Sequence, residues 1–119
     1  MSTLESSLTT LTGLKGALSA AVVDYNSGMV LGSKGNGIDI EVAAAGNTEL
    51  IRAKLRTMKD LGIAGAIEDI LVTLDQQYHI LRPSESSPGL FIYFILDKEA
   101  GNLALARRKV EEIDRELVV

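Results

Sequence analysis

The chain has 119 residues, of which 46% are hydrophobic and 24% charged, and its formal net charge is -4. This composition is typical of a globular protein and excludes a disordered one. At this length about two thirds of the unfolded surface can be buried around one core, so we expect a single domain spanning residues 1–119. The acidic balance disfavours a general nucleic-acid binder, which needs many Lys and Arg side chains to displace counterions from phosphate.

The chain contains no cysteine, which excludes disulfides and thiolate metal sites and fits a reducing compartment. Its first residues lack the basic start and apolar core of a secretory signal. The longest strongly apolar run, Leu90 to Leu96, is too short to span a bilayer. We therefore expect a cytoplasmic protein with no membrane insertion.

Four leucines at helical spacing predict a short first helix: Leu4, Leu8, Leu11 and Leu14. Thr3 or Ser2 can cap its N-terminus, and Gly13 and Gly16 can end it. The apolar run Ala17 to Asp24 then predicts a strand.

A tight turn at Asn26-Ser27-Gly28 follows this strand and predicts a hairpin. The returning strand is expected at Met29 to Gly32, and Ser33 to Gly37 is expected to be a loop.

Ile38 to Leu61 predicts a long second helix, with Asp39 as a possible N-cap and Gly62 as the C-terminal stop. Its apolar stripe is wider than packing on one sheet requires. The stripe comprises Ala44, Ile51, Leu55 and Met58 and extends to Ala43, Gly46, Leu50 and Leu61.

Three strands are predicted next, at Ala66 to Leu74, Tyr78 to Pro83 and Leu90 to Asp97. The last of these is apolar on both faces, which indicates the central strand of a sheet covered by helices on each side. A final helix is predicted from Asn102 to Val118. Its buried stripe is Leu103, Ala106, Val110, Ile113 and Leu117, and the pairs Arg107/Glu111 and Arg108/Glu112 are expected to support its exposed face.

The resulting order is α-β-β-α-β-β-β-α. We therefore expect an α+β fold with a five-stranded antiparallel sheet, the long helix on one face and the terminal helices on the other. This order, the length and the opening helix and hairpin resemble those of roadblock/LC7 domains. The resemblance implies a non-enzymatic homodimer that serves as scaffold or regulator of a small Ras-like GTPase. Bacterial members include the partner of the gliding-motility GTPase, which accelerates GTP hydrolysis, so an activating role is implied as well.

Catalytic, metal and cofactor sites are not expected. His79 is the only histidine and lies in a predicted strand, where an ordinary hydrogen bond is the expectation. The segment Gly32 to Gly37 matches neither a Walker A motif nor a dinucleotide fingerprint. Gly32-x-x-Gly35 matches the backbone-clamping loop of KH domains, but a strand precedes it and the protein is acidic, so nucleic acid is not an expected partner.

The dimer interface is expected at two places. Strand Ala66 to Leu74 should lie at the sheet edge, where Ile70 and Val72 would meet a partner strand. The second place is the part of the second helix where the apolar stripe extends beyond what packing on its own sheet requires. The residues there are Ala43, Gly46 and Leu50. In roadblock/LC7 domains these elements join two subunits into one continuous sheet with the second helices side by side.

Glu49, Arg52, Arg56 and Lys59 are the candidate partner-binding residues. Cations near a helix C-terminus also complement the helix dipole and solvate its outer face, so this interpretation stays open. If the second helices form the docking platform, these side chains would meet the GTPase first. The alternative function is a small-molecule sensing module of profilin-like or longin-like fold, since related mixed sheets can hold a ligand between sheet and helix.

Overall fold

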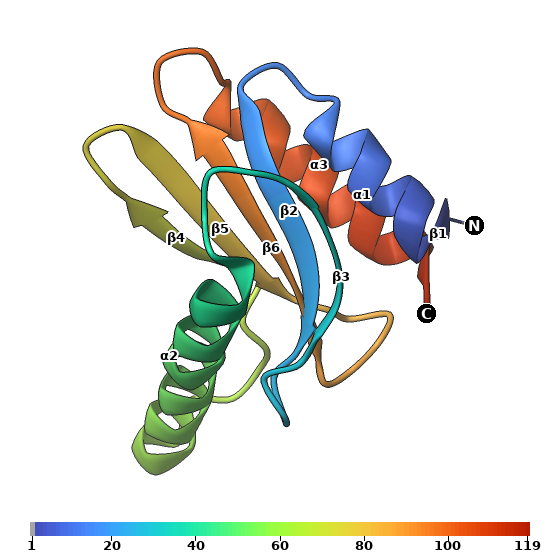
Figure 1. The fold of residues 1–119 in the computed structure, drawn as a ribbon. Coiled ribbons are helices and arrows are strands. Elements are labelled where there is room, and N and C mark those ends of the chain that lie inside the picture. The colour runs from blue at the N-terminus through green and yellow to red at the C-terminus, as the bar shows by residue number, and fades with distance from the viewer. Residues whose placement is uncertain (1) are drawn as a thin grey trace.

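The computed structural model describes residues 2–119. A five-stranded antiparallel sheet with strand order β3-β2-β6-β5-β4 lies between two helical layers. Its strands are β2 (Ala17–Asp24), β3 (Val30–Gly35), β4 (Ile70–Thr73), β5 (Gln77–Pro83) and β6 (Leu90–Asp97). The helices are α1 (Leu4–Thr12), α2 (Ile40–Leu61) and α3 (Leu103–Glu116), with α2 on one face of the sheet and α1 and α3 on the other (Figure 1). The α+β class, the order of these elements and the layering confirm the sequence prediction.

β6 is the middle strand, as predicted, and it divides the core into two halves. Ile92, Phe94 and Leu96 are buried against the α1 and α3 layer. The intervening Phe91, Tyr93 and Ile95 are buried in the cluster that α2 covers with Ala44 and Ile51. Successive strand residues point to opposite faces, so one apolar run serves both halves of the core.

The helix caps follow the sequence closely. Thr3 accepts a hydrogen bond from the Ser6 amide at 3.1 Å and caps α1. Asp39 does the same for the Val42 amide at 3.3 Å and caps α2. Gly62 has a φ of 70° after the last residue of α2, a conformation that favours glycine. The amide of Gly62 donates to Lys59 O and that of Ile63 to Met58 O, which closes the helix end.

The predicted loop from Ser33 to Gly37 is wrong in its first half. β3 continues to Gly35 because Lys34 and Gly35 pair with Ala20 and Ser19 of β2, and Ser19 Oγ donates to Lys34 O at 3.2 Å. Cross-strand pairing overrides the poor strand propensity of this polar, glycine-rich stretch. The Gly32-x-x-Gly35 unit therefore lies in a strand, which removes the likeness to a KH loop.

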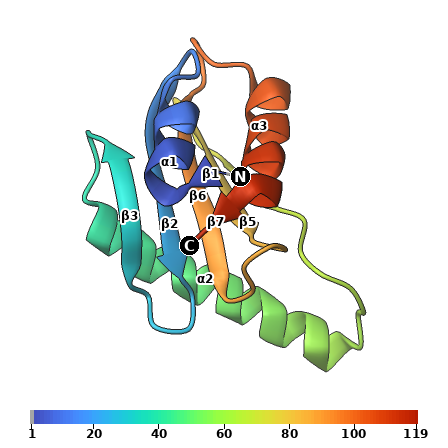
Figure 2. The same ribbon diagram turned by 90° about the vertical axis from the view of Figure 1, so that its right-hand side faces the viewer.

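Several other boundaries differ from prediction, among them those of β4 and the final helix. β4 begins at Ile70, so residues 66–69 are an exposed or half-buried connection and not strand. The final helix ends at Glu116, because Leu117 adopts extended backbone and pairs in β7 (Leu117–Val118) with β1 (Ser2–Thr3). This parallel pair brings the two ends of the described chain together beside α1 (Figure 2).

Candidate interaction surfaces

β4 is one edge of the sheet, as predicted, and is paired only with β5. Ile70 is part of the core under α2, and Val72, two residues further, points to the same face. Leu71 points to the opposite face and packs against the α1 and α3 core. Both Ile70 and Val72 are half-buried, and the side of β4 away from β5 has no strand partner in the described chain.

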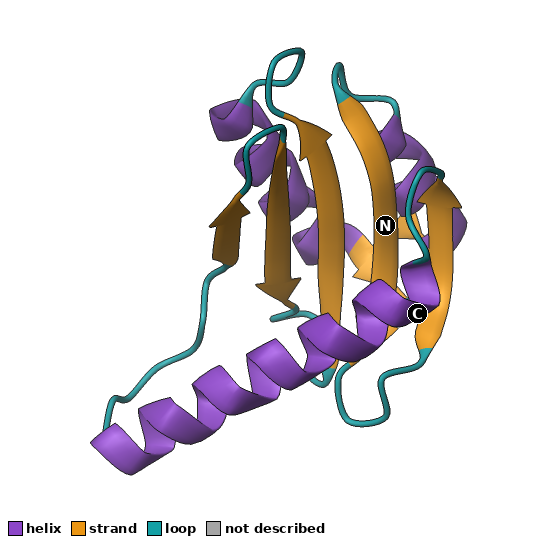
Figure 3. Ribbon diagram, turned by 60° about the vertical axis from the view of Figure 1, so that its left-hand side comes forward, coloured by secondary structure: helices purple, strands orange, loops and turns teal. Residues whose placement is uncertain are grey.

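α2 crosses the sheet and extends past β4 into open space (Figure 3). Leu55 packs on the core, but the apolar side chains that follow are more exposed: Leu61 is 67% and Ile63 is 54% exposed. Nothing in the described chain covers either side chain. We call Leu61 and Ile63, at the overhanging end of α2, the apolar shelf; residues 62–69 join it to the open edge strand β4.

A second apolar stripe runs along the outer side of α2. Its members recur at helical spacing and are exposed or half-buried: Val42, Ala43, Gly46, Leu50, Ala53 and Leu61. Gly46 has open space around it, so another helix could approach its backbone closely. Of the residues predicted here, Gly46 and Leu50 are exposed, whereas Ala43 is half-buried and packs partly on the core of its own chain.

Glu49, Arg52, Arg56 and Lys59 are all exposed. At about 100° per residue they lie on one flank of α2, beside the outer apolar stripe and not on the line most distant from the sheet. Glu49, Arg52 and Arg56 border a shallow hollow around Ala53. Their side chains form no ion pair with another described residue, so their charges face solvent.

A chain of polar side chains lies in the layer between the sheet and α2. His79 forms hydrogen bonds through both ring nitrogens: Nε2 donates to Gln77 Oε1 at 2.8 Å, and Nδ1 of the neutral ring accepts from the Tyr93 hydroxyl at 2.8 Å. Tyr93 also bonds Asn47 of α2. Burial lowers the pKa of His79, and burial raises the pKa of Tyr93 against the opposing effect of Asn47. His79 is thus a hydrogen-bonded strand histidine, as predicted, but its link to α2 was not foreseen.

On the other face of the sheet, a buried carboxylate of α3 accepts hydrogen bonds from β5 and from the loop after it. Asp114 accepts from Arg82 Nε at 3.1 Å, from the Glu85 amide at 3.0 Å and from the Ser84 hydroxyl. Burial by itself would raise the pKa of Asp114, but these bonds outweigh it and hold the pKa below the ordinary value of 3.8. A role for Asp114 was not among the predictions made from the sequence. Its signal was available, because Asp114 falls on the apolar stripe of the helix, four residues after Val110 and three before Leu117.

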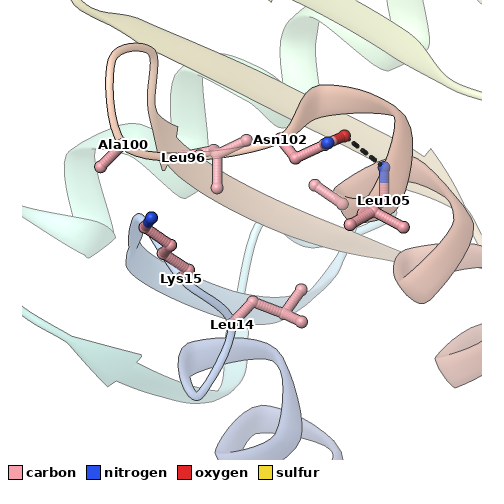
Figure 4. A pocket seen from close by; sticks show the side chains of 8 residues that line it. Leu14, Lys15, Leu96, Ala100, Asn102 and Leu105 are labelled. Carbon is pink, nitrogen blue, oxygen red and sulfur yellow. Dashed lines mark hydrogen bonds between the residues drawn. The ribbon is translucent and has the colours of Figure 1, made fainter.

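A hollow of 420 Å³ lies where the segment after α1 meets the start of α3 (Figure 4). Leu14 and Lys15 line one side, and Leu96, Asn102 and Leu105 the other. The Asn102 oxygen already accepts from the Leu105 amide at 3.0 Å as the cap of α3. Lys15 is therefore the one charged group in the lining, and few polar groups are left to orient a small ligand.

Residues 2–119 bring together no group of three His, Cys, Asp or Glu side chains suited to a metal ion. Within the same residues no helix is both long enough and apolar enough to cross a bilayer.

Comparison of the structure with solved structures identifies the fold. It is that of the roadblock/LC7 domain. The sequence itself matches no protein-family model and no curated protein.

Three similar structures illustrate the match. A roadblock/LC7 domain from Streptomyces avermitilis has a TM-score of 0.82 at 18% identity, over 97% of this chain and 94% of that one. MglB from Myxococcus xanthus has a TM-score of 0.83 at 19% identity, over 95% and 89%. The gliding protein MglB from Thermus thermophilus has a TM-score of 0.70 at 18% identity, over 92% and 87%. The shared feature is the fold over nearly the whole chain.

Proposed function

We propose that this protein is a single roadblock/LC7-like domain that works as a non-enzymatic homodimer, as a scaffold or regulator of a small Ras-like GTPase. The observation that carries the dimer is the apolar shelf of α2 together with the open edge of β4. A second copy that pairs its β4 antiparallel to the first would bring its own sheet under the overhang and cover Leu61 and Ile63. The end of α2 and the edge strand β4 are joined by residues 62–69, so one partner copy could contact both.

The dimer interface comprises the residues predicted for it, Ala43, Gly46, Leu50, Ile70 and Val72, to which we add Leu61 and Ile63. Backbone pairing between the two β4 strands would set the relative direction and register of the two copies. The apolar side chains of α2 would supply the buried apolar area that stabilises the dimer. A C2 arrangement is expected, because the same patch then contacts itself.

Two substitutions test the dimer. Leu50→Asp places a charge in the seam, by which we mean the contact between the α2 helices of the two copies. Val72→Pro removes a backbone donor from the edge strand. Either should give a monomer in sedimentation velocity at micromolar concentration, where the wild type should be a dimer. Leu105→Asp is the matched control, since Leu105 is 56% exposed on α3 and should leave the dimer intact. A wild-type monomer would end the dimer proposal.

The GTPase partner is proposed from the likeness to MglB and to roadblock/LC7 platforms. Glu49, Arg52, Arg56 and Lys59 are exposed beside the seam, so a partner resting on the paired α2 helices would meet them. Cations at the rim of such a surface act mainly on the rate of encounter with an acidic partner. The protein would act by contact, in the cytoplasm, with any acceleration of GTP hydrolysis carried out by residues of the GTPase.

Affinity capture from the native cell with GDP or a non-hydrolysable GTP analogue should recover a small GTPase. Surface plasmon resonance with that GTPase then tests the platform. The double variant Arg52→Glu/Arg56→Glu should slow association and reduce its salt dependence. Arg108→Glu/Arg115→Glu on α3 is the matched control and should bind as the wild type does. Equal association rates for both variants would show that the GTPase docks elsewhere.

A further inference from the structure

The segment that connects α2 to β4, residues 62–69, has few anchors. Gly62 and Ile63 close the helix, and the residues after them are mostly exposed. From residue 64 to residue 69, every hydrogen bond to another described residue runs to an arginine of the sheet or of α3. These arginines are therefore the main anchors of the connection just before β4, whereas β4 itself is held by its pairing with β5.

Arg107 of α3 makes the stronger contact. Its Nε and Nη2 donate to the two carboxylate oxygens of Asp69, each at 2.9 Å, in a bidentate pair. Arg107 was expected to pair with Glu111 along its own helix. That prediction is wrong, because Glu111 pairs with Arg115 and leaves Arg107 to reach across to the residue just before β4. Bidentate geometry fixes orientation as well as distance.

Arg82 of β5 makes the second contact. Its Nη1 donates to Glu68 O at 3.2 Å, while its Nε is held by Asp114 at 3.1 Å. Arg82 is buried, and its guanidinium is thereby fixed between α3 and the connection. Two neighbouring residues, Glu68 and Asp69, are thus clamped immediately before Ile70, where β4 begins.

We propose that Arg107 and Arg82 are positioning residues for homodimerisation, which hold the start of β4 so that a second copy of this chain meets one strand register. This inference rests on the proposed homodimer. A slip of one residue would turn Ile70 and Val72 to the wrong face, and β4 is only Ile70–Thr73, so its ladder alone specifies register weakly. Arg107 lies in the helical layer opposite α2 and acts on the interface through β4.

Salt gives this arrangement a distinctive signature. The Arg107–Asp69 pair is partly exposed, and exposed ion pairs are screened by added salt. The charges that flank the seam on α2 are unchanged when Arg107 is replaced by Ala, so the difference in salt dependence between the wild type and that variant reports on the Arg107–Asp69 pair. Added salt should weaken the wild-type dimer relative to the variant dimer.

The test compares Arg107→Ala and Asp69→Asn with Arg115→Ala, which breaks an ion pair internal to α3 and is the matched control. The dimer dissociation constant, from sedimentation equilibrium, should rise at least about fivefold in the first two and stay unchanged in the control. The charge exchange Arg107→Asp/Asp69→Arg should restore most of the affinity. Hydrogen exchange measured in a Leu50→Asp background should show faster exchange in β4 for Arg107→Ala and unchanged exchange in β6.

The outcomes separate the two proposals. A dimeric wild type with unchanged affinity and unchanged β4 exchange in Arg107→Ala would overturn the positioning role and leave the dimer standing. A monomeric wild type would end the dimer proposal, and exchange in β4 would then still decide whether Arg107 holds the strand. Equal losses in β4 and β6 would mean general destabilisation and would also overturn the positioning role.

Discussion

The hydroxyl of Tyr93 and Nδ1 of His79 lie 2.8 Å apart, and their rings meet edge to face with centroids 5.6 Å apart. The two residues come from neighbouring strands, β6 and β5, and Tyr93 passes the contact on to Asn47 of α2. His79 is also the cross-strand neighbour of Val72 on the open edge strand. This polar chain therefore joins α2 to β6 and to β5, the strand next to the open edge.

Stability should fall as the pH drops below about 6.5, because burial lowers the pKa of His79 in the folded state. The unfolded chain then binds a proton that the folded chain resists, so protons favour unfolding. His79→Gln removes the titration. Urea unfolding at pH 7.5 and 5.5 should show a larger loss for the wild type than for the variant. Parallel losses would show that His79 does not carry the dependence.

Asp114→Asn should destabilise the protein by about 3 to 5 kcal/mol, because it leaves the buried guanidinium of Arg82 without its charged partner. The folded-state pKa of Asp114 is lowered, so its stabilising contribution is present above the ordinary value of 3.8 and is lost as the pH falls through the lower folded value. Acid unfolding of the wild type and the variant should thus converge at low pH. A constant gap between them down to the acid transition would contradict this role.

Phe94→Ala should cost about 3 to 5 kcal/mol, since Phe94 is fully buried in the central strand between α1 and α3. Thermal unfolding gives the comparison. Leu31→Ala, at a half-exposed apolar position of β3, should stay within about 0.5 kcal/mol of the wild type. Similar melting temperatures for all three proteins would mean that Phe94 is not a core residue.

Gly46→Ala should change folding and assembly in opposite directions. Alanine is favoured over glycine in a helix by about 1 kcal/mol, and the site has room for a Cβ within one chain. In the Leu50→Asp monomer the substitution should therefore raise the free energy of unfolding. In the wild-type background it should weaken the dimer, because a close helix approach would meet the new methyl group. A variant dimer as tight as the wild type would place Gly46 outside the seam.

Much of the fold could be predicted because its signals are local. β2 and β6 have the bounds expected from their apolar runs, and the caps of α2 at Asp39 and Gly62 are those that capping chemistry predicts. The bounds of β3 and β4 differ from prediction because contacts with residues distant in sequence determine them. β3 is lengthened by β2, and β4 is shortened where Arg82 and Arg107 hold the chain.

The candidate surfaces were predicted only in part, for the same reason. The edge position of β4 and the extra width of the apolar stripe on α2 can be inferred from the order of the elements and the spacing of the apolar residues. The polar chain of His79, Tyr93 and Asn47 joins three elements that are far apart in sequence, so no spacing rule indicates it. The partner of Arg107 likewise could not be chosen from the sequence. Glu111 lies four residues from both Arg107 and Arg115, so helical spacing allows it to pair with either.

The parallel pairing of β1 with β7 has a practical consequence for experiments on this protein. Ser2 and Leu117 are cross-strand neighbours, so both ends of the described chain leave from one corner, on the side of α1 and α3 (Figure 2). α2 lies on the other side of the sheet (Figure 1), and the exposed charged residues Glu49, Arg52, Arg56 and Lys59 belong to it. A fluorophore, purification tag or surface linker attached at either end would consequently leave the α2 face turned outward and accessible.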